Sequence, residues 1–588
     1  MNNYALNKPK DQPQKPSIWG ALKTLFPVIK SEKKNLILAS IALIINSALN
    51  LIGPMIMGYT IDAYIIQTQN YQRVLMYSGI LLATYLIALV SHYFQTLFMG
   101  RVGQHTLFNL RNKLFNTIQS LPLAFFNQNK AGDLISRINN DTDKLNMFFS
   151  QSLVQFVANL MSMIGAGIFL ISLHGRLGLA SLVPAFILLV FTRIISPWIK
   201  SKNAKNLKSI GGMSAEISEN LDNFKVIVAF NRRDYFRKKL QTANQDSYQK
   251  AIKAGIANNT LTPLYGLFSS LAQLIVITYG IYLISIGDFS LGLLISFLTY
   301  ISRFYDPMRQ MAAIWSSFQT AMAGWDRIYD ILSLKSNLNT IEDTKEHSHN
   351  SLLGMQDVSF AYPDGKEVLH HIHFDLKPGK TYALVGPTGG GKTTTASLMA
   401  RLYDPTEGSI LLHGKDIRSY TPDELAKKIG FILQEPFLFT GTVAENILYG
   451  NEEYRDIDHA KLQERITQEG LGSLLARFEA GLETEISAQG GGLSLGQKQL
   501  IAFMRAVLRK PELLILDEAT ANIDTVTEQL LEDILQKLPK STTKVIIAHR
   551  LNTIENADEI FFVNAGEVIL AGSMEEAVSM LLHGKRKS

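Results

Sequence analysis

The sequence predicts a multi-domain chain in which an all-α membrane-spanning half is followed by a soluble α/β half. Long apolar runs are confined to the first 340 of 588 residues. Those 340 residues have a net charge of +17 and the rest have −11, which together give the +6 of the whole chain. A glycine-rich loop between a strand-like run and a helix-like run lies in the second half. The two halves are therefore expected to face different environments.

The composition excludes several classes of protein. Charged residues make up 18% of the chain, against about 25% in an ordinary soluble protein. The chain contains no cysteine, which excludes a disulfide scaffold, a thiolate metal site and a cysteine nucleophile. The basic residues of the first half lie between apolar runs rather than on one folded face, so no nucleic-acid partner is expected.

Six apolar runs in the first half predict membrane-spanning helices, because about 20 consecutive apolar residues cross the hydrocarbon core of a bilayer. The runs cover about residues 36–58, 74–100, 148–173, 177–199, 258–286 and a segment that begins near 291. The fourth run contains one charged residue, Arg193, and the sixth contains Arg303, Asp306 and Arg309. Six such runs within 340 residues argue against a soluble helical core.

Lysine and arginine residues indicate the orientation, since they gather on the cytoplasmic side of a membrane. The segment before the first run and the connections after the second and fourth runs contain seven, six and twelve of them, against only Arg73 and Arg176 on the other side. We therefore expect a multi-pass membrane protein with its N-terminus and its second half in the cytoplasm. Residues 1–34 form a tail without the apolar core and cleavage site of a signal peptide. We expect disorder over residues 1–16 and an interfacial amphipathic helix over residues 18–29.

The two cytoplasmic connections contain helical patterns of apolar residues, which predict that the spanning helices continue beyond the membrane. Pro122 and Gly132 bracket a break around residues 124–127 in the first connection. A short apolar patch covers residues 223–230 in the second. Each is a candidate tip that contacts the soluble half, and ordinary packing within the bundle is the alternative.

A phosphate-binding loop is predicted in the second half. Its sequence fits the pattern G-x-x-x-x-G-K-[ST] and lies between a strand-like run, 381–385, and a helix-like run, 394–402, which is the context that the motif requires. Glycine lets backbone N–H groups approach phosphate oxygens, while the lysine reaches the β- and γ-phosphates and the hydroxyl after it binds Mg²⁺. The candidate nucleotide-binding residues are Gly386, Thr388, Gly389, Gly390, Gly391, Lys392, Thr393 and Thr394.

A second strand-like run, 512–516, ends in Asp517 and Glu518. A buried strand that delivers an acid at its carboxyl end is expected of the element that holds Mg²⁺ opposite a phosphate-binding loop. Asp517 and Thr393 are therefore the candidate metal ligands. Glu518 is placed to act as general base on the attacking water.

A third motif, Leu493-Ser494-Leu495-Gly496-Gln497, lies between these two. With six apolar runs followed by the three motifs, the chain resembles an ATP-binding-cassette (ABC) transporter half of the exporter type, over essentially its whole length after the tail. The resemblance implies a six-helix transmembrane domain of ABC exporter type over residues 35–330, a linker over 331–350 and an α/β P-loop nucleotide-binding domain over 351–588. It also implies ATP and Mg²⁺ as cofactors.

The resemblance assigns roles to residues that carry little signal alone. Tyr362 corresponds to the aromatic residue that stacks on adenine, and Gln434 to a glutamine that coordinates Mg²⁺ or the attacking water. His549 corresponds to the histidine that hydrogen-bonds the γ-phosphate. Asp524 ends the loop that follows the acidic strand, and Thr484-Glu485 matches a short segment before the third motif.

In the family, two cassettes dimerise head to tail, so that the third motif of one closes over the nucleotide held by the other. The resemblance therefore implies a second half-transporter as partner, with Ser494, Gly496 and Gln497 facing the partner's nucleotide. The usual motif is Leu-Ser-Gly-Gly-Gln, whereas this chain has Leu495 at the third position. Some relatives pair two different chains, and the chain with an intact glutamate and histidine often carries the altered motif. We favour a heterodimer for this reason, and a homodimer with a tolerated substitution remains the alternative.

The charges of the sixth run allow two interpretations. Arg303, Asp306 and Arg309 are spaced so that adjacent members can pair along one helix face. Charges within a membrane span usually face a bundle interior or a wet cavity, so these residues either line a substrate path or form a structural ion pair.

The resemblance implies export of an amphipathic or hydrophobic small molecule across the bacterial cytoplasmic membrane, driven by ATP hydrolysis. The alternatives are a homodimeric lipid or peptide exporter, an exporter-fold importer of a metal–chelator complex, and a nucleotide-gated channel or sensor. Glu518 and His549 argue against the last, since a gate needs nucleotide binding more than hydrolysis.

Overall fold

The computed structural model describes residues 4–6, 27, 30–336, 338, 340–342, 351–363, 365–454, 457–487, 490–517, 525–548 and 555–583. The chain forms two compact units. The helical unit comprises residues 10–117 and 132–333, and the α/β unit comprises residues 1–9, 118–131 and 334–588. Most of the predicted amphipathic helix, 18–29, lies outside the described residues.

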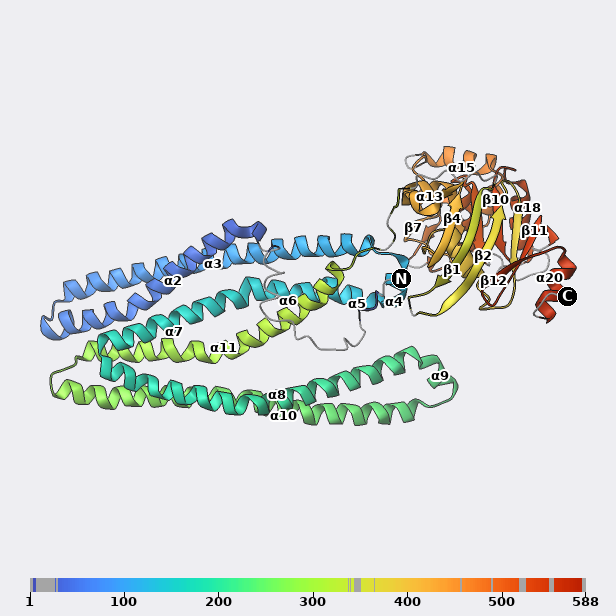
Figure 1. Cartoon of the computed structure of the whole chain (residues 1–588). Coiled ribbons are helices and arrows are strands. Elements are labelled where there is room, and N and C mark those ends of the chain that lie inside the picture. The colour runs from blue at the N-terminus through green and yellow to red at the C-terminus, as the bar shows by residue number, and fades with distance from the viewer. Residues whose placement is uncertain are drawn as a thin grey trace. The chain divides into compact units, whose positions relative to one another are not determined.

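The helical unit consists of long helices joined by short turns (Figure 1). Each predicted apolar run lies within one continuous helical segment. The segments are Lys33–Thr60 (α2) with the π-helical turn Ile61–Gln67, Tyr71–Gln119 (α3), Ala131–Leu173, Gly175–Asp222 (α8), Arg233–Ser285 (α10) and Leu291–Leu332 (α11). The third segment is built from Ala131–Ser136 (α5), Thr142–Met147 (α6) and Leu153–Leu173 (α7), joined by the π-helical turns Arg137–Asp141 and Phe148–Ser152.

Among the described residues, five of these segments are long and apolar enough to cross a membrane, and α11 supplies the sixth predicted helix but carries more charge. At 1.5 Å per residue the 49 residues of α3 extend for about 74 Å, more than twice the roughly 30 Å of a hydrocarbon core. The expected continuation of the helices beyond the membrane is therefore present. The predicted break in the first connection contains a short separate helix, Leu123–Gln128 (α4), and the apolar patch in the second forms another, Phe224–Ala229 (α9).

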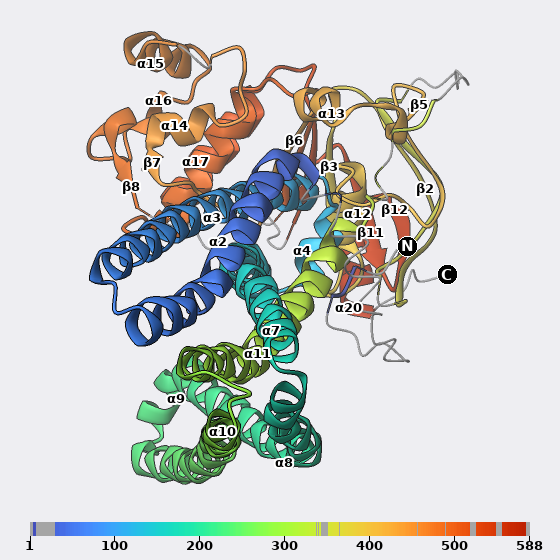
Figure 2. The same ribbon diagram turned by 90° about the vertical axis from the view of Figure 1, so that its left-hand side faces the viewer.

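The helices of the helical unit pack through small residues as well as large apolar ones. Seen in Figure 2, α8 and α10 lie side by side, as do α7 and α11. Gly58 of α2 meets Gly292 of α11 so closely that a Cβ added to Gly292 would lie 2.1 Å from the Gly58 carbonyl oxygen. Close backbone approach at small residues is a common way for membrane helices to associate. At the same contact Asp62 accepts a hydrogen bond of 2.8 Å from the N–H of Gly292, which satisfies an otherwise free donor at the start of α11.

A buried ionic cluster joins the segment α5–α6 to the end of α11. Asp141 is fully buried and lies 3.2 Å from Arg327 and 2.7 Å from Lys144. Arg137 is 2% exposed, lies 2.9 Å from Asp133 and donates a hydrogen bond of 2.6 Å to the Arg327 carbonyl. The carboxylates of Asp133 and Asp141 thus each have a cationic partner, as buried charges require.

Of the two interpretations of the α11 charges, the structural ion pair is not formed within the described residues. Among the described residues, Arg303, Asp306 and Arg309 have no ion pair, and the Arg303 Nε atom is buried without a hydrogen-bond partner. Arg303 is half-buried whereas Asp306 is exposed, so their side chains lie in different surroundings although three residues separate them.

The α/β unit contains two main sheets. The first is antiparallel with the order β2-β1-β4-β5, and the second, mostly parallel, has the order β12-β11-β3-β10-β9-β6. The strands are Leu353–Ala361 (β1), Glu367–Leu376 (β2), Thr381–Val385 (β3), Glu407–Leu412 (β4), Lys415–Asp416 (β5), Ile429–Ile432 (β6), Leu513–Asp517 (β9), Thr543–Ile547 (β10), Glu559–Asn564 (β11) and Glu567–Ala571 (β12). A small pair joins Gly441–Thr442 (β7) and Glu485–Ile486 (β8). Thr484 and Glu485, matched to a family segment, lie at this pair.

Helices cover the parallel sheet and form a separate cluster beside it. They are Lys392–Met399 (α12), Pro422–Lys428 (α13), Val443–Leu448 (α14), His459–Gln468 (α15), Gly472–Leu475 (α16), Leu495–Val507 (α17), Thr525–Lys537 (α18) and Met574–His583 (α20). The five residues of β9 are all buried, as expected of a central parallel strand covered on both faces. The expectations for an α/β second half are confirmed.

Residues 4–6 differ from the expected disorder. Tyr4 is 2% exposed, and its N–H donates a hydrogen bond of 2.8 Å to the side chain of Gln128, the last residue of α4. Residues 4–6 thus belong to the packed α/β unit. Composition could not indicate this, because the partners of Tyr4 lie more than a hundred residues away in the chain.

Candidate functional site

The phosphate-binding loop joins β3 to α12 in a backbone conformation that depends on glycine. Gly386, Gly389 and Gly391 have positive φ angles of 149°, 81° and 116°, a region that other L-residues enter only with strain. The loop also packs tightly, since a Cβ added to Gly386 would lie 2.0 Å from the Val563 carbonyl oxygen of β11. The same carbonyl would be 2.6 Å from a Cβ on Gly390. The loop is therefore fixed in shape by the neighbouring strand.

Lys392 begins α12 and bends back across the loop. It is 6% exposed, and its Nζ donates hydrogen bonds to the carbonyls of Gly386 at 2.8 Å and Pro387 at 3.1 Å. The loop thus holds the ammonium group beside the N–H groups at the start of α12, where the helix dipole also favours an anion. Thr388 and Gly389 are exposed at the tip of the loop, and Thr394 is buried behind it.

The two candidate metal ligands converge at the carboxyl end of the sheet. The Thr393 hydroxyl donates a hydrogen bond of 3.4 Å to Asp517 Oδ1, although 124 residues separate them. Asp517 ends β9 and is 3% exposed. Gln434 is exposed and follows the neighbouring strand β6 by two residues. Because parallel strands β3, β9 and β6 end at one edge of the sheet, these groups share the crevice where such sheets bind ligands.

Three predicted site residues, Glu518, Asp524 and His549, lie outside the described residues. The residues that directly precede two of them, Glu518 and His549, are described. Asp517 precedes Glu518 directly, and the N–H of Ala548, just before His549, donates a hydrogen bond of 3.1 Å to the Leu384 carbonyl at the end of β3.

Tyr362 is brought to the phosphate-binding loop from the other sheet. It follows β1, and its hydroxyl lies 3.1 Å from the Thr394 hydroxyl in the first turn of α12. Its ring meets Phe360 at a centroid distance of 4.9 Å and Tyr403 at 5.5 Å, both edge to face. These contacts fix the half-buried ring beside the loop. Burial raises the pKa of Tyr403 above its ordinary value, so its hydroxyl stays protonated.

The third motif caps α17. Ser494 accepts a hydrogen bond of 3.2 Å from the Gln497 N–H, while the Gln497 side chain accepts one of 2.9 Å from the Ser494 N–H. This capping box satisfies two free donors at the helix start. Leu495 is the first helical residue, where backbone angles suit any L-residue, so its replacement of the usual glycine introduces no backbone strain.

The third motif and the phosphate-binding loop of this chain are not joined. Among the described residues, no hydrogen bond links Ser494, Gly496 or Gln497 to residues 386–394. Ser494 is exposed and Gly496 is half-buried.

The donor set fits a nucleotide phosphate with Mg²⁺. The loop offers closely packed backbone N–H groups and one ammonium group, which suit phosphate oxygens. Thr393 and Asp517 offer hard oxygen ligands, which suit Mg²⁺ completed by phosphate oxygens and water. In the described part of the chain, no group of three or more His, Cys, Asp or Glu side chains could hold a metal ion.

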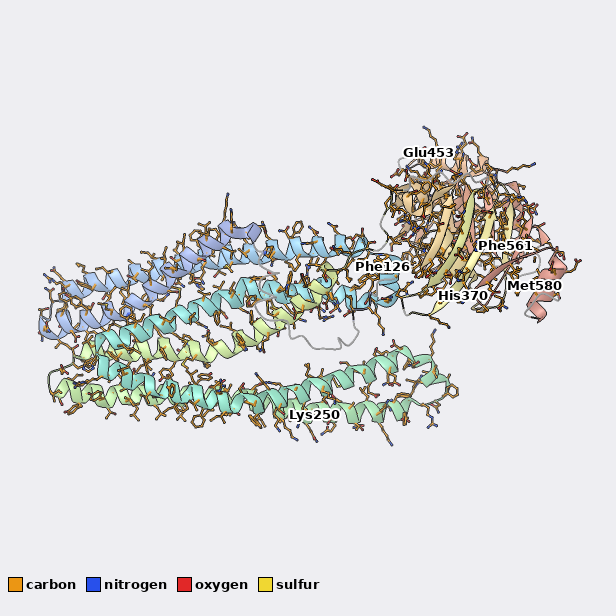
Figure 3. The ribbon with its side chains drawn as sticks, viewed as in Figure 1. Phe126, Lys250, His370, Glu453, Phe561 and Met580 are labelled. Atoms are coloured by element: carbon orange, nitrogen blue, oxygen red, sulfur yellow. The ribbon has the colours of Figure 1, made fainter. Side chains whose placement is uncertain are left out.

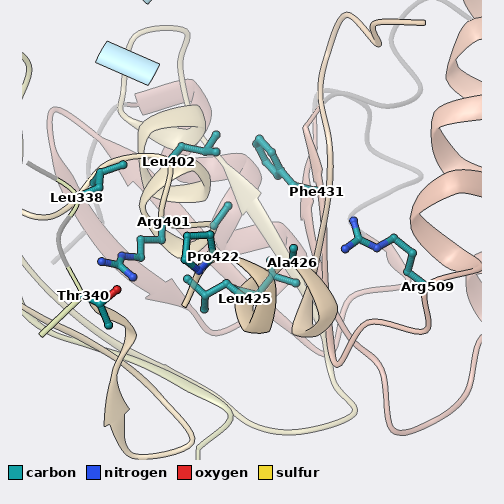
Figure 4. Close-up of a pocket in the computed structure, with 11 residues that line it drawn as sticks. Leu338, Thr340, Arg401, Leu402, Pro422, Leu425, Ala426, Phe431 and Arg509 are labelled. Carbon is teal, nitrogen blue, oxygen red and sulfur yellow. The ribbon is translucent and has the colours of Figure 1, made fainter. Parts of the chain in front are cut away.

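Figure 4 shows a separate pocket of the α/β unit, with a volume of about 360 Å³. Arg401, Phe431 and Arg509 are among its lining residues, and no residue of the phosphate-binding loop is. The guanidinium of Arg401 is already held by Asp404 at 3.2 Å and by the Tyr420 carbonyl at 2.8 Å. The pocket is therefore distinct from the nucleotide site.

Sequence reasoning missed two participants in the site. Val563 shapes the loop through its carbonyl oxygen, which no side-chain pattern reveals. Tyr403 supports the Tyr362 ring and lies four residues beyond α12, where a lone tyrosine carries no motif.

Long apolar helices together with a loop and sheet edge of this geometry define a membrane-bound P-loop ATPase. Residues 36–308 match the family model described as the ABC transporter transmembrane region, and residues 369–521 match the model described as ABC transporter. The chain is 33% identical over 567 residues to the uncharacterized ABC transporter ATP-binding protein YfiC of Bacillus subtilis, with 95% of this chain and 92% of the relative covered. The chain belongs to the ABC transporter family.

Two further relatives have more specific names. A fatty acid ABC transporter ATP-binding/permease protein of Mycobacterium tuberculosis is 32% identical, with 85% of this chain and 78% of the relative covered. A multidrug resistance ABC transporter ATP-binding and permease protein of Lactococcus lactis is 30% identical, with coverages of 82% and 81%. With one transmembrane region and one cassette, the chain is an exporter-type half-transporter whose ATPase is coupled to transport across a membrane.

Proposed function

We propose that the chain is one half of a dimeric exporter that moves amphipathic or hydrophobic small molecules out of the bacterial cytoplasm. The observation that carries this proposal is that the exposed Ser494 and the half-buried Gly496 have no hydrogen bond, within the described residues, to the phosphate-binding loop of the same chain. A second cassette would bring the two together. Fatty acid and multidrug transporters among the relatives support an apolar or amphipathic substrate.

In the proposed mechanism, the residues of the loop bind and orient the triphosphate. Lys392 and the N–H groups of the loop would hold phosphate oxygens, while Thr393, Asp517 and Gln434 would hold Mg²⁺. When bound, that ion would supply charge stabilisation for phosphoryl transfer to water. Glu518 takes a proton from the attacking water, and His549 donates a hydrogen bond at the phosphate to be released. Tyr362 offers an aromatic face to the base.

Replacing Glu518 by Gln tests this assignment. The substitution keeps the size of the side chain and removes its basicity, so steady-state ATP hydrolysis should fall by roughly a hundredfold or more while ATP binding is retained. Lys392→Ala is the matched control, because it should weaken ATP binding itself. ATP turnover and binding of a fluorescent ATP analogue are measured on both variants, and persistent turnover in Glu518→Gln would remove Glu518 from the role of base.

We further infer a heterodimer, in which Lys392, Asp517, Glu518 and His549 complete a competent site with the third motif of a different chain. Leu495 supports this inference because it alters the motif that this chain would give to the partner's nucleotide. The chain purified alone should then show little cooperative ATPase activity. Robust cooperative turnover and transport by this polypeptide alone would favour the homodimer.

Arg303 is the best candidate for a residue of the substrate path. Among the described residues, its Nε atom is buried without a hydrogen-bond partner, in a helix that would span the membrane. A buried donor of a cation in that setting favours a substrate or a partner chain that brings an acceptor. If Arg303→Gln leaves the relative transport of ethidium and a fluorescent fatty acid unchanged, Arg303 is not part of the path.

A further inference from the structure

Residues 4–6, close to the N-terminus, hold α4 in place. The side-chain amide of Asn129 donates a hydrogen bond of 2.9 Å to the Tyr4 carbonyl and accepts one of 3.0 Å from the Leu6 N–H. Gln128 accepts a hydrogen bond of 2.8 Å from the Tyr4 N–H. Three backbone groups of residues 4–6 are thus satisfied by two neighbouring side chains at the end of α4, as buried backbone groups require. We call residues 4–6 the strap.

The strap also reaches the segment that leads into the α/β fold. The Tyr4 hydroxyl donates a hydrogen bond of 3.0 Å to the Lys335 carbonyl, 331 residues further along the chain. Tyr4 is 2% exposed and Asn129 is 8% exposed. The strap therefore joins three parts of the sequence: the N-terminus, the end of α4 and the segment after α11.

A second contact connects α4 to the nucleotide site. Asn127 donates a hydrogen bond of 2.7 Å from its side-chain amide to the Tyr403 hydroxyl. Tyr403 packs edge to face against Tyr362, which lies at the phosphate-binding loop. Phe125 of α4 is fully buried, while Phe126, labelled in Figure 3, is 42% exposed. Thus one end of α4 carries both contacts, Asn127 to Tyr403 and the next two residues to the strap.

We propose that the strap positions α4 on the α/β unit. When nucleotide binding moves Tyr362 and Tyr403, an α4 that is held by the strap would move with them, whereas a loosely held α4 would shift independently. Tyr4 and Asn129 are positioning residues, which act through α4 and do not touch nucleotide. The strap would set how much transport each hydrolysed ATP drives. This inference rests on the proposed export function, because the ratio of transport to hydrolysis has a meaning only for a chain that transports.

Hydrogen exchange on the intact dimer tests the strap without any variant. The amides of Tyr4 and Leu6 both donate hydrogen bonds, so they should exchange more slowly than the amides of an unstructured, solvent-exposed terminus. Complete exchange of these two amides at the shortest labelling time would overturn the strap. This measurement does not depend on transport, so its failure is distinguishable from failure of the export proposal.

Transport and turnover measured together test the consequence. In proteoliposomes of the full dimer loaded with ethidium, Tyr4→Ala should leave the KM for ATP unchanged and lower the ethidium moved per ATP hydrolysed by about fivefold, at the low end of ordinary coupling between sites. Tyr4→Phe keeps the buried ring and loses only the hydrogen bond to Lys335. Its ratio of ethidium moved to ATP hydrolysed should therefore lie between those of Tyr4→Ala and the unmodified chain. Leu6→Ala is the matched control, because only the backbone of Leu6 takes part in the strap.

Each result decides the proposal. A lower ratio in Tyr4→Ala with faster exchange over residues 123–131 supports it. An unchanged ratio, or a fall in ATP turnover that parallels the fall in transport, would overturn it, since a merely structural role predicts the second outcome. If Tyr4→Ala does not assemble, Tyr4→Phe and Asn129→Ala give the same comparison. If the parent dimer hydrolyses ATP but moves no ethidium, the ethidium assignment fails while the exchange result still decides the strap.

Discussion

Gly386 is the residue of the phosphate-binding loop with the least freedom to change. Its φ of 149° and the Val563 carbonyl oxygen, which would lie 2.0 Å from an added Cβ, both exclude a side chain. Gly389 has a positive φ of 81° as well, but a Cβ there would meet nothing within 4 Å. Substitutions at the two glycines therefore distinguish two effects: a side chain at Gly389 would strain only the backbone, whereas one at Gly386 would also collide with Val563.

Gly386→Ala should abolish ATP binding, because the loop would have to move away from β11. Gly389→Ala, the matched control, carries only the conformational penalty of about 1–2 kcal/mol for a left-handed residue. Binding of a fluorescent ATP analogue and thermal unfolding are measured on both. Equal losses in the two variants would show that contact with Val563 does not determine the shape of the loop.

At the scale of elements, the ionic cluster fixes α11 to the segment α5–α6. Arg327 contacts both Asp133 and the fully buried Asp141, and its carbonyl also accepts a hydrogen bond from Arg137. Removing the Arg327 side chain leaves Asp141 with Lys144 alone. Losing one partner of a buried charge is expensive because the remaining charge stays out of water.

Arg327→Ala should lower the free energy of unfolding by on the order of 2 kcal/mol, less than the 3–5 of a wholly buried pair because Arg327 is 40% exposed. Lys144→Ala is the control, since Lys144 contacts Asp141 alone and its loss leaves the Arg327 pairs in place, so it should contribute about 1 kcal/mol or less. Thermal unfolding in detergent compares the two. A Lys144→Ala effect equal to that of Arg327→Ala would contradict the central place of Arg327.

The sequence predicted elements well where the signal is local. Hydropathy marks the long helices, and Pro122 and Gly132 mark the break that contains α4. The fold of the phosphate-binding loop follows from glycines at fixed spacing. The charges of α11 show the limit of local signals. Helical spacing allows Arg303 to pair with Asp306, but it cannot tell that Arg303 is half-buried and Asp306 exposed.

The part of the site that sequence reasoning could not supply depends on distant contacts. Asn127 and Tyr403 are 276 residues apart, and Tyr4 and Lys335 are 331 apart. No local pattern distinguishes such residues from others of their type. Motifs identified the loop and its acid, whereas tertiary packing selected the residues that support them.

For the whole molecule, a heterodimer makes the two site halves of this chain unequal. Its phosphate-binding loop would serve the competent site and its third motif the other. Lys392→Ala should then abolish ATP turnover by the dimer, whereas Ser494→Ala should reduce it by less than about threefold.

Turnover is measured on both variants, co-purified with the partner chain. In a homodimer both changes affect the same two sites, so both should abolish turnover. Equal and complete loss in the two variants would therefore contradict the heterodimer.

The absence of cysteine allows the orientation of the whole chain to be measured by single cysteines. Asn70, between α2 and α3, should as cysteine react with a membrane-impermeant maleimide on intact cells, since lysine and arginine place that turn outside. Asn223, between α8 and α9, should react only after permeabilisation. The reverse pattern would overturn the inferred orientation, and the unmodified chain is the blank for both.

The strap has a consequence for how the protein is made. Tyr4 leaves the ribosome long before the Lys335 carbonyl that it binds, which follows 331 residues later. At a translation rate of about 5–20 residues per second that interval is roughly 15–65 s. During this time the long helices are synthesised, and Tyr4 cannot form its hydrogen bond to Lys335. Residues 4–6 are thus synthesised early but reach their native contacts late. A bulky tag fused before them would be expected to slow this late docking.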